Sequence, residues 1–367
     1  MPIPLIIGAA GIAAVATAIK KSYDGYTSHA EASEILDSAK KQYNEEFTKF
    51  QAAEKSAMTA LDQLGSLELN IGASFHEFGN LADDLMGRLQ KQGKFQDLKL
   101  NIPKHKLQQI EGYSATAVGV LGSIAGAGVA GASAGFAVYG GVMSLAAAST
   151  GTAISTLSGA AATNATLAAI GGGSLASGGL GIAGGTALLG GAVIAPILAV
   201  AGWAYAKHGE EAVSAAKVTR KEMMDATIKT IQARGSMEKI EHWAKKLDIK
   251  ISSINQVFLQ HLDALKKINA YVQSVVDLGL DPEVELQRVG DKVLLSVQNG
   301  YAIAAILVDV LTTPLFKVQK NGEAVLRDTH GNPLLEKDAD GSMVLNDAEL
   351  DQAMIRSDVA LAAAQAA

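Results

Sequence analysis

The chain has 367 residues, 49% of them hydrophobic, with a net charge of −6 and no cysteine. This length and apolar content can bury a large core, while the lack of cysteine excludes disulfide frameworks, thiolate zinc sites and cysteine nucleophiles. No lysine and arginine cluster is interleaved with aromatic residues, so the footprint of a nucleic-acid-binding protein is missing and nucleic acid is not expected as a partner.

Residues 1–21 predict an apolar N-terminal helix. The segment from Met1 to Ile19 is apolar apart from Thr17, and two lysines follow it. It lacks the basic region that opens a secretory signal peptide, although residues 14–16, Ala-Val-Ala, resemble a weak cleavage site. We favour an uncleaved helix that lies on or enters a membrane or packs on the protein body, and a cleaved signal is the alternative.

Residues 22–111 predict a helical arm. From Asp24 to about Leu64 apolar residues recur in steps of three and four, close to an eleven-residue repeat. A second helix is expected from Leu67 to Gln92, with a connection up to Pro103. The apolar side of the arm consists of Leu36, Ala39, Tyr43, Phe47, Phe50, Ala53, Ala57, Leu61, Leu64, Phe75, Phe78, Leu81, Leu85 and Leu89.

Residues 112–206 contain no Asp, Glu, Lys, Arg or His, and they hold 22 of the 38 glycines. Elsewhere about one residue in four is charged, as in ordinary domains. Two apolar subsegments, 113–148 and 187–206, are each long enough to cross a hydrocarbon layer of about 30 Å. Residues 149–186 between them, rich in glycine and hydroxyl groups, form the tip or a third helix. The stretch therefore predicts a hydrophobic hairpin.

The side chains expected to enter a bilayer are the large apolar residues of these two subsegments. They are Val118, Leu121, Ile124, Phe136, Tyr139, Leu188, Leu189, Val193, Ile194, Ile197, Leu198, Trp203 and Tyr205. Basic residues flank the hairpin on both sides, which favours both ends on the same, cytoplasm-like side of a membrane.

Glycine pairs four residues apart place small side chains on one helical face, where another helix can approach closely. The predicted helix-packing glycines are Gly122 with Gly126, Gly131 with Gly135, and Gly181 with Gly185.

Residues 207–315 predict a second helical arm. Apolar residues recur at three and four spacing from Glu210 to Leu278, with Gly235 as a point where the helix could break. Asp281 is expected to cap a further helix that starts at Pro282 and reaches about Leu311. The apolar side of the first helix consists of Met237, Ile240, Ala244, Leu247, Ile251, Ile254, Phe258, Leu262, Leu265, Tyr271, Val272 and Val275.

Residues 316–367 differ in kind. The turn dipeptides at 321–322, 330–331 and 340–341 each precede an apolar pair, which suggests a small β-meander or a flexible tail before an alanine-rich, weakly helical end. The predicted fold class is therefore mainly α. We expect an elongated bundle of long amphipathic helices that carries the glycine-rich helical hairpin and ends in this small β-hairpin-like or irregular tail.

A hydrophobic hairpin on long helices resembles, in layout, the α-helical pore-forming toxins, the pore-forming colicins and the apolipoprotein-L-like proteins. Residues 149–191 also look like a glycine-rich block that recurs in bacterial proteins, and they read STGTAISTLSGAAATNATLAAIGGGSLASGGLGIAGGTALLGG. These resemblances imply a bacterial membrane-active protein without a catalytic motif.

The sequence contains few residues in patterns typical of catalysis, nucleotide binding or metal binding. The seven histidines form no pair at helical spacing. A GxGxxG match at Gly179, Gly181 and Gly184 follows no β-branched strand and has no acidic residue downstream until Glu210, so it is a weak nucleotide-site candidate. A loose calcium-loop pattern comprises Glu336, Asp338, Asp340 and Asp347, but a turn with solvated carboxylates is preferred. No enzyme activity, cofactor or metal is therefore predicted.

Two functional hypotheses follow. In the first, the hairpin is packed among the arms in a soluble form and enters a lipid bilayer, as a pore-forming or membrane-remodelling component, after self-assembly into a homo-oligomer or with related helical partner subunits. In the second, the protein is a non-catalytic scaffold, membrane-tethered or soluble, with the hairpin as anchor or buried core. We expect a membrane-associated protein, on the cytoplasmic face or secreted without a clear signal peptide.

Overall fold

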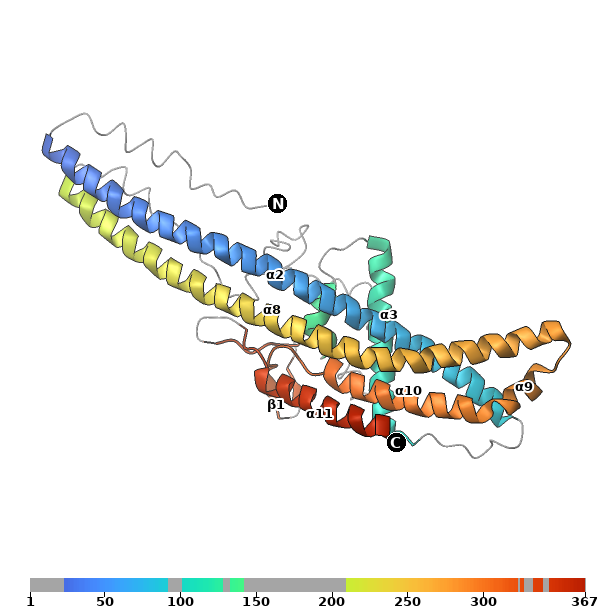
Figure 1. The fold of residues 1–367 in the computed structure, drawn as a ribbon. Helices are drawn as coiled ribbons and strands as arrows, with labels where there is room; N and C mark the ends of the chain where they lie inside the picture. Colours follow the sequence, from blue (N-terminus) through green and yellow to red (C-terminus); the bar gives the residue numbers. More distant parts are fainter. Residues whose placement is uncertain are drawn as a thin grey trace. The chain divides into compact units, whose positions relative to one another are not determined.

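The computed structural model describes residues 23–91, 101–127, 133–141, 209–322, 324–326, 333–338 and 343–366. These residues are mainly α-helical, which confirms the predicted fold class (Figure 1). Contacts divide the chain into two compact units, the first comprising Met1–Lys55 and Gly190–Glu238, the second Ser56–Leu189 and Lys239–Ala367. The predicted N-terminal helix, residues 1–21, lies outside the described residues, as does most of the predicted hairpin.

Helix α2 (Tyr23–Gln90) runs without a break through the point where the sequence predicted two helices. The prediction of a separate helix from Leu67 was wrong because no proline interrupts the stretch and the apolar stripe continues across it. The predicted buried side is confirmed, since Tyr43, Ala57 and Leu61 are almost fully enclosed.

Helix α8 (Gly209–Ser274) is also continuous, and Gly235 does not interrupt it. Its predicted apolar side is buried from Met237 to Val275, with the exception of Tyr271, which is 42% exposed. The hydroxyl of Tyr271 donates a hydrogen bond to the Glu285 carboxylate at 2.6 Å. This polar contact accounts for the position of the ring at the surface.

The first unit contains the N-terminal part of α2 and the N-terminal part of α8, which lie side by side and run in the same direction (Figure 1). Tyr43 and Phe50 of α2 and Met223 and Met237 of α8 are among its buried side chains. The Arg234 guanidinium lies 3.6 Å from the Glu46 carboxylate. This unit is thus a parallel pair of helices over the described residues.

The second unit gathers the rest of α2 and α8 with α3 (Lys104–Ala127), a helical segment at 133–141, α9 (Pro282–Arg288), α10 (Gly290–Leu311) and α11 (Asp347–Ala366). Helix α10 packs against α3, α9 and α11. A connected series of ring contacts forms its centre. In order, the rings are Phe136, Tyr113, Phe75, Phe258, Phe78 and Tyr301, with neighbouring centroids 5.1–6.3 Å apart.

Glycine is required where backbones approach most closely in the second unit. A Cβ added to Gly72 of α2 would lie 2.2 Å from the Cβ of Ala117 on α3, and one added to Gly65 would lie 1.7 Å from the carbonyl oxygen of Ser133. On α10, a Cβ at Gly300 would lie 2.2 Å from the ring of Phe78. These three positions admit no larger residue without movement of a neighbouring helix.

The link between α8 and α10 was partly predicted. Asp281 caps α9 by accepting a hydrogen bond from the Glu283 amide at 2.9 Å, as expected. The expected single helix to Leu311 was wrong, because α9 ends at Arg288 and α10 starts at Gly290. Tertiary contacts hold α9 in place, since Arg88 of α2 pairs with Glu283 at 2.9 Å.

The C-terminal part combines a small β structure with a helix. Strands β1 (Lys320–Asn321) and β2 (Ala324–Val325) pair antiparallel around Gly322, whose φ of 64° suits glycine. Isolated bridges join Phe316 to Leu345 and Val318 to Leu335. The first predicted turn is confirmed, and the other two turn dipeptides lie outside the described residues.

The final residues, for which the sequence predicted a weakly helical end, form α11. A weakly helical sequence becomes a defined helix here because α8 holds it through side chains. The Trp243 indole N–H donates to Asp347, Lys246 pairs with Asp351 at 2.8 Å, and Lys250 pairs with Asp358. Helix α11 also packs along α10.

We expect Gly72→Ala to lower the free energy of unfolding by about 1–3 kcal/mol, because the new methyl group overlaps the rigid Cβ of Ala117. The control is Gly87→Ala on the same helix, where nothing lies within 4 Å and the higher helix propensity of alanine should stabilise by about 0.5–1 kcal/mol. Urea unfolding of both variants measures the difference. Equal effects of the two substitutions would contradict the close approach of α3 to α2.

Candidate functional site

Five of the predicted membrane-inserting residues lie in described parts of the charge-free stretch. Val118 and Leu121 are half-buried on α3, and Ile124 lies near its end. Phe136 and Tyr139 belong to the helical segment 133–141 and are only 4% and 7% exposed. The others lie outside the described residues: Leu188, Leu189, Val193, Ile194, Ile197, Leu198, Trp203 and Tyr205.

The beginning of the charge-free stretch is part of the core of the second unit. Helix α3 starts in the charged sequence at Lys104 and continues past Gly112 without a break. The ring of Tyr113 contacts Phe136 edge-on at a centroid distance of 5.8 Å and Phe75 of α2 at 6.3 Å. The Lys106 ammonium also pairs with Asp309 of α10.

Of the predicted helix-packing glycines, Gly135 is buried on the 133–141 segment and Gly126 lies on α3. Gly122 is exposed, and an added Cβ there would meet nothing within 4 Å. The remaining members, Gly131, Gly181 and Gly185, lie outside the described residues. The close contacts to this stretch come instead from Gly65 and Gly72 of α2, which the sequence had not singled out.

Sequence reasoning also missed Glu68, a carboxyl that lies between those two glycines on α2 and is 5% exposed. Burial raises its pKa well above the ordinary value, and the nearby charge of Asp248 on α8 raises it further. In the sequence Glu68 lies three residues after Gly65 and four before Gly72, hence on the same helix face as both glycines, but no local feature shows that this face is buried.

Tyr113 completes this polar centre. Its hydroxyl is buried and has no hydrogen-bond partner, and burial together with the charge of Glu68 raises its pKa well above the ordinary value. An unpaired buried hydroxyl beside a buried carboxyl stores unfavourable free energy in the contact between α2 and α3.

No arrangement for catalysis or metal binding is found in the described ranges. Within them, no three His, Cys, Asp or Glu side chains lie close enough together to hold a metal ion. Of the weak calcium candidates, Glu336 and Asp338 lie in the extended C-terminal part, Asp347 accepts the Trp243 hydrogen bond at the start of α11, and Asp340 lies outside the described residues.

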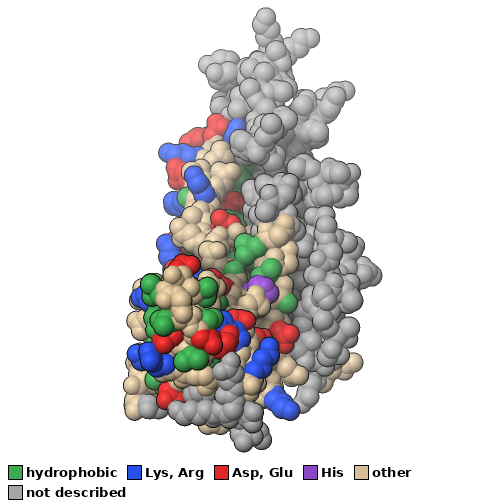
Figure 2. Space-filling view, turned by 90° about the vertical axis from the view of Figure 1, so that its right-hand side faces the viewer, with side chains coloured by type: hydrophobic (Ala, Val, Ile, Leu, Met, Phe, Trp, Pro, Cys, Tyr) green, Lys and Arg blue, Asp and Glu red, His purple; other side chains and the backbone are tan. Residues whose placement is uncertain are grey.

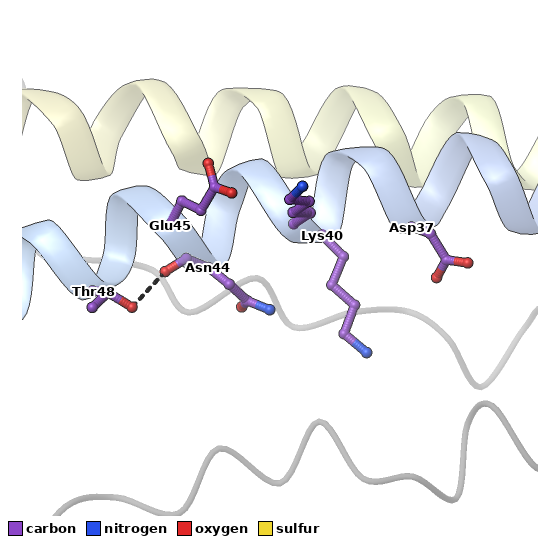
Figure 3. A pocket seen from close by; sticks show the side chains of 6 residues that line it. Asp37, Lys40, Asn44, Glu45 and Thr48 are labelled. Carbon is purple, nitrogen blue, oxygen red and sulfur yellow. Dashed lines mark hydrogen bonds between the residues drawn. The ribbon is translucent and has the colours of Figure 1, made fainter.

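A polar hollow lies along α2 in the first unit (Figure 3). Its described lining consists of Asp37, Lys40, Lys41, Asn44, Glu45 and Thr48, all from one helix. The Thr48 hydroxyl donates to the Asn44 carbonyl oxygen at 2.8 Å, which is an ordinary bond within a helix. Groups of both charges from a single helix do not converge on one point, so this hollow offers no reactive centre.

Helix α10 is the single described helix long and apolar enough to cross a membrane by length and composition. Half of its apolar window is buried in the protein, and Val297, Ile303 and Leu307 form part of the core of the second unit. A core helix can have the same length and apolar composition, so the packing of α10 accounts for its apolar sequence.

Exposed apolar side chains gather at two places. One is the turn from α8 to α9, where Val276, Leu278, Leu280 and Val284 are 49–73% exposed beside Asp277. Figure 2 looks toward this end of the second unit and shows apolar side chains there among charged ones. The other is the N-terminal part of α8 in the first unit, where Met224, Ile228 and Ile231 are 40–53% exposed.

No protein-family model, curated protein or solved structure matches the chain.

We expect Glu68→Gln to raise the free energy of unfolding at neutral pH. A raised folded-state pKa means that the native state holds its proton more tightly than the unfolded chain, so rising pH between the ordinary and the raised value favours unfolding. The gain from the substitution should therefore be small below the ordinary carboxyl pKa and should grow as pH rises. Urea unfolding at several pH values measures it.

The control for this series is Asp62→Asn, an exposed carboxyl on the same helix, for which we expect little change of the free energy of unfolding at any pH. A Glu68→Gln gain that is independent of pH would refute the assignment of the effect to ionisation of the buried carboxyl.

Proposed function

We propose that the protein interacts with membranes through its charge-free stretch, residues 112–206, which enters a bilayer as a pore-forming or membrane-remodelling element after self-assembly. The single observation that carries the proposal is the run of 95 residues without Asp, Glu, Lys, Arg or His, with Lys104 and Lys106 shortly before it and Lys207 directly after it. Charged residues at the bilayer centre cost about 2.5–3.5 kcal/mol each, so a run without them is a condition for insertion.

The contacts of the described part of this stretch support a form that can be released. At the closest approaches, alanine and the backbone meet glycine, as with Ala117 against Gly72 and Ser133 against Gly65. Such residues bury little apolar area, and the hydrophobic gain is about 25 cal/mol per Å². The buried Glu68 and the unpaired Tyr113 hydroxyl lower the stability of the same contact.

The raised pKa of Glu68 bears on what could trigger release of the charge-free stretch. Because protonation of this carboxyl stabilises the packed form, acid favours packing of α3 against α2 through this group. A release triggered by acid would have to act through other residues. We therefore expect the target membrane, and not low pH at Glu68, to drive rearrangement.

A second candidate function is a non-catalytic scaffold in which the stretch anchors the protein or packs within it. The observation that favours this candidate is the burial of Phe136 and Tyr139, which lie in the core of the second unit and do not face solvent. A scaffold with the stretch packed inside differs from the first candidate in that residues 187–206 do not enter lipid. A scaffold with the stretch as its anchor differs in that it releases no trapped dye.

We expect the full chain to release a dye trapped in lipid vesicles and Ile197→Asp to reduce the release rate about a hundredfold. One carboxylate at the centre of an inserted segment costs about 2.5–3.5 kcal/mol. The matched control is Val359→Asp, which adds the same charge at a side chain that is 68% exposed on α11 and should leave release unchanged. Absence of release from vesicles of varied lipid composition and pH would refute the proposal.

A dye on a single introduced cysteine can show whether residues 187–206 enter lipid. Since the chain has no cysteine, Ala199→Cys can carry one polarity-sensitive dye within 187–206, and Ala362→Cys places the same dye on the exposed side of α11. We expect vesicles to shift the emission of the dye at position 199 to shorter wavelength and to leave that at 362 unchanged. Vesicle binding without a shift at 199 would favour the scaffold.

A further inference from the structure

We infer that an exposed face of α8 in the first unit is a docking surface for anionic phospholipid headgroups. The inference rests on the proposed function in that it names the lipid class that the membrane must contain. The surface, called the α8 basic face, consists of Lys217, Arg220, Lys221, Met224, Ile228 and Ile231.

Helical geometry brings these side chains to one side. Positions 217, 221, 224, 228 and 231 follow alternating steps of four and three, and position 220 precedes 224 by four. All six residues are exposed, and the three apolar side chains are 46%, 53% and 40% exposed in chain order. The opposite side of the same helix, which includes Met223, Ala226 and Thr230, is buried in the first unit.

The exposed apolar side chains of the face would be stabilised by a partner that removes them from water. Met224, Ile228 and Ile231 are consecutive on the face, so their exposed areas adjoin and form a patch, whereas single exposed apolar residues are ordinary. Lys217, Arg220 and Lys221 lie at the N-terminal end of that patch. A helix with this composition lies in a membrane interface, with the apolar side chains among the acyl chains and the cationic groups on lipid phosphates.

Charge decides which partner fits. The face carries three cationic side chains and no acidic one, and Glu210 and Glu238 lie on the same side of α8 seven residues beyond its two ends. The nearest carboxylate, Asp225, lies at the margin of the face, and Glu222 lies farther round the helix. A second copy pairing through this face would present the same three cations, whereas an anionic bilayer supplies complementary charge at every point.

The exposed turn between α8 and α9 does not share this chemistry. Its apolar side chains are accompanied by Asp277, Asp281 and Glu283, and anionic lipid would repel these carboxylates. Position along the chain also favours the α8 basic face. Lys217 lies about 12 Å along α8 from its start at Gly209, and residues 187–206 immediately precede this helix. Docking here would hold that apolar stretch close to the lipid.

The test is flotation of the full chain with vesicles of phosphatidylcholine alone and of phosphatidylcholine with an equal part of phosphatidylglycerol. We expect binding to the anionic vesicles that weakens with added salt. The triple variant Lys217→Gln/Arg220→Gln/Lys221→Gln should bind them on the order of a hundredfold more weakly. The double variant Ile228→Ser/Ile231→Ser should also bind more weakly but keep the salt dependence.

The matched control, Lys229→Gln/Lys317→Gln/Lys320→Gln, removes the same charge from exposed residues outside the face and should bind as the parent does. Unfolding in urea checks that all variants are folded. Unchanged flotation of the first triple variant overturns the inference, and so does equal binding of the parent to both kinds of vesicle or to neither. If that variant instead lowers the oligomer mass in vesicle-free buffer and floats normally, the face joins copies of the chain and the inference is overturned.

Dye release separates this inference from the proposed function. Flotation that depends on the α8 basic face, without dye release, supports the docking surface while the pore-forming proposal fails. Dye release together with equal flotation of the parent and the triple variant supports the proposed function. The same result overturns the docking surface.

Discussion

The close approach of α3 and the 133–141 segment to α2 is the constraint on which the second unit depends. Gly65 and Gly72 remove the side chains that would hold these backbones apart. Only at that separation can Tyr113 reach Phe75 and Phe136 reach Tyr113, so that both join the series of ring contacts that continues through α8 to Tyr301 on α10. Overpacking at a single glycine would therefore disturb the placement of several helices at once.

The contact of α3 with α2 includes buried polar groups that lower its stability. Glu68 and the hydroxyl of Tyr113 are buried in the otherwise apolar core of the second unit, and Asp248 adds a like charge near Glu68. A core chosen only for stability would place apolar side chains there. Polar groups that destabilise this contact narrow the free-energy difference between the packed form and the released form of the charge-free stretch that we propose.

The two units carry different surface chemistry. In the first, a cationic face on α8 with three exposed apolar side chains suits anionic lipid. In the second, the exposed apolar side chains of the α8–α9 turn lie among carboxylates, while α10 is the most apolar described helix and is used as core. Attachment and insertion would thus be separate tasks, with α8 making the first contact and the charge-free stretch making the second.

The sequence by itself determined the mainly α fold, the buried sides of α2 and α8, the Asp281 cap and the turn at Gly322, because each depends on local periodicity or backbone preference. It also located the charge-free stretch. Tertiary structure alone decided that the chain divides between α9 and α10 and that the weakly helical end is held as α11, because Arg88, Trp243 and Lys246 make those contacts across more than a hundred residues. The close contacts of Gly65, Gly72 and Gly300 and the burial of Glu68 could not be predicted either, since a glycine or a carboxyl carries no local sign of which helix will pack against it.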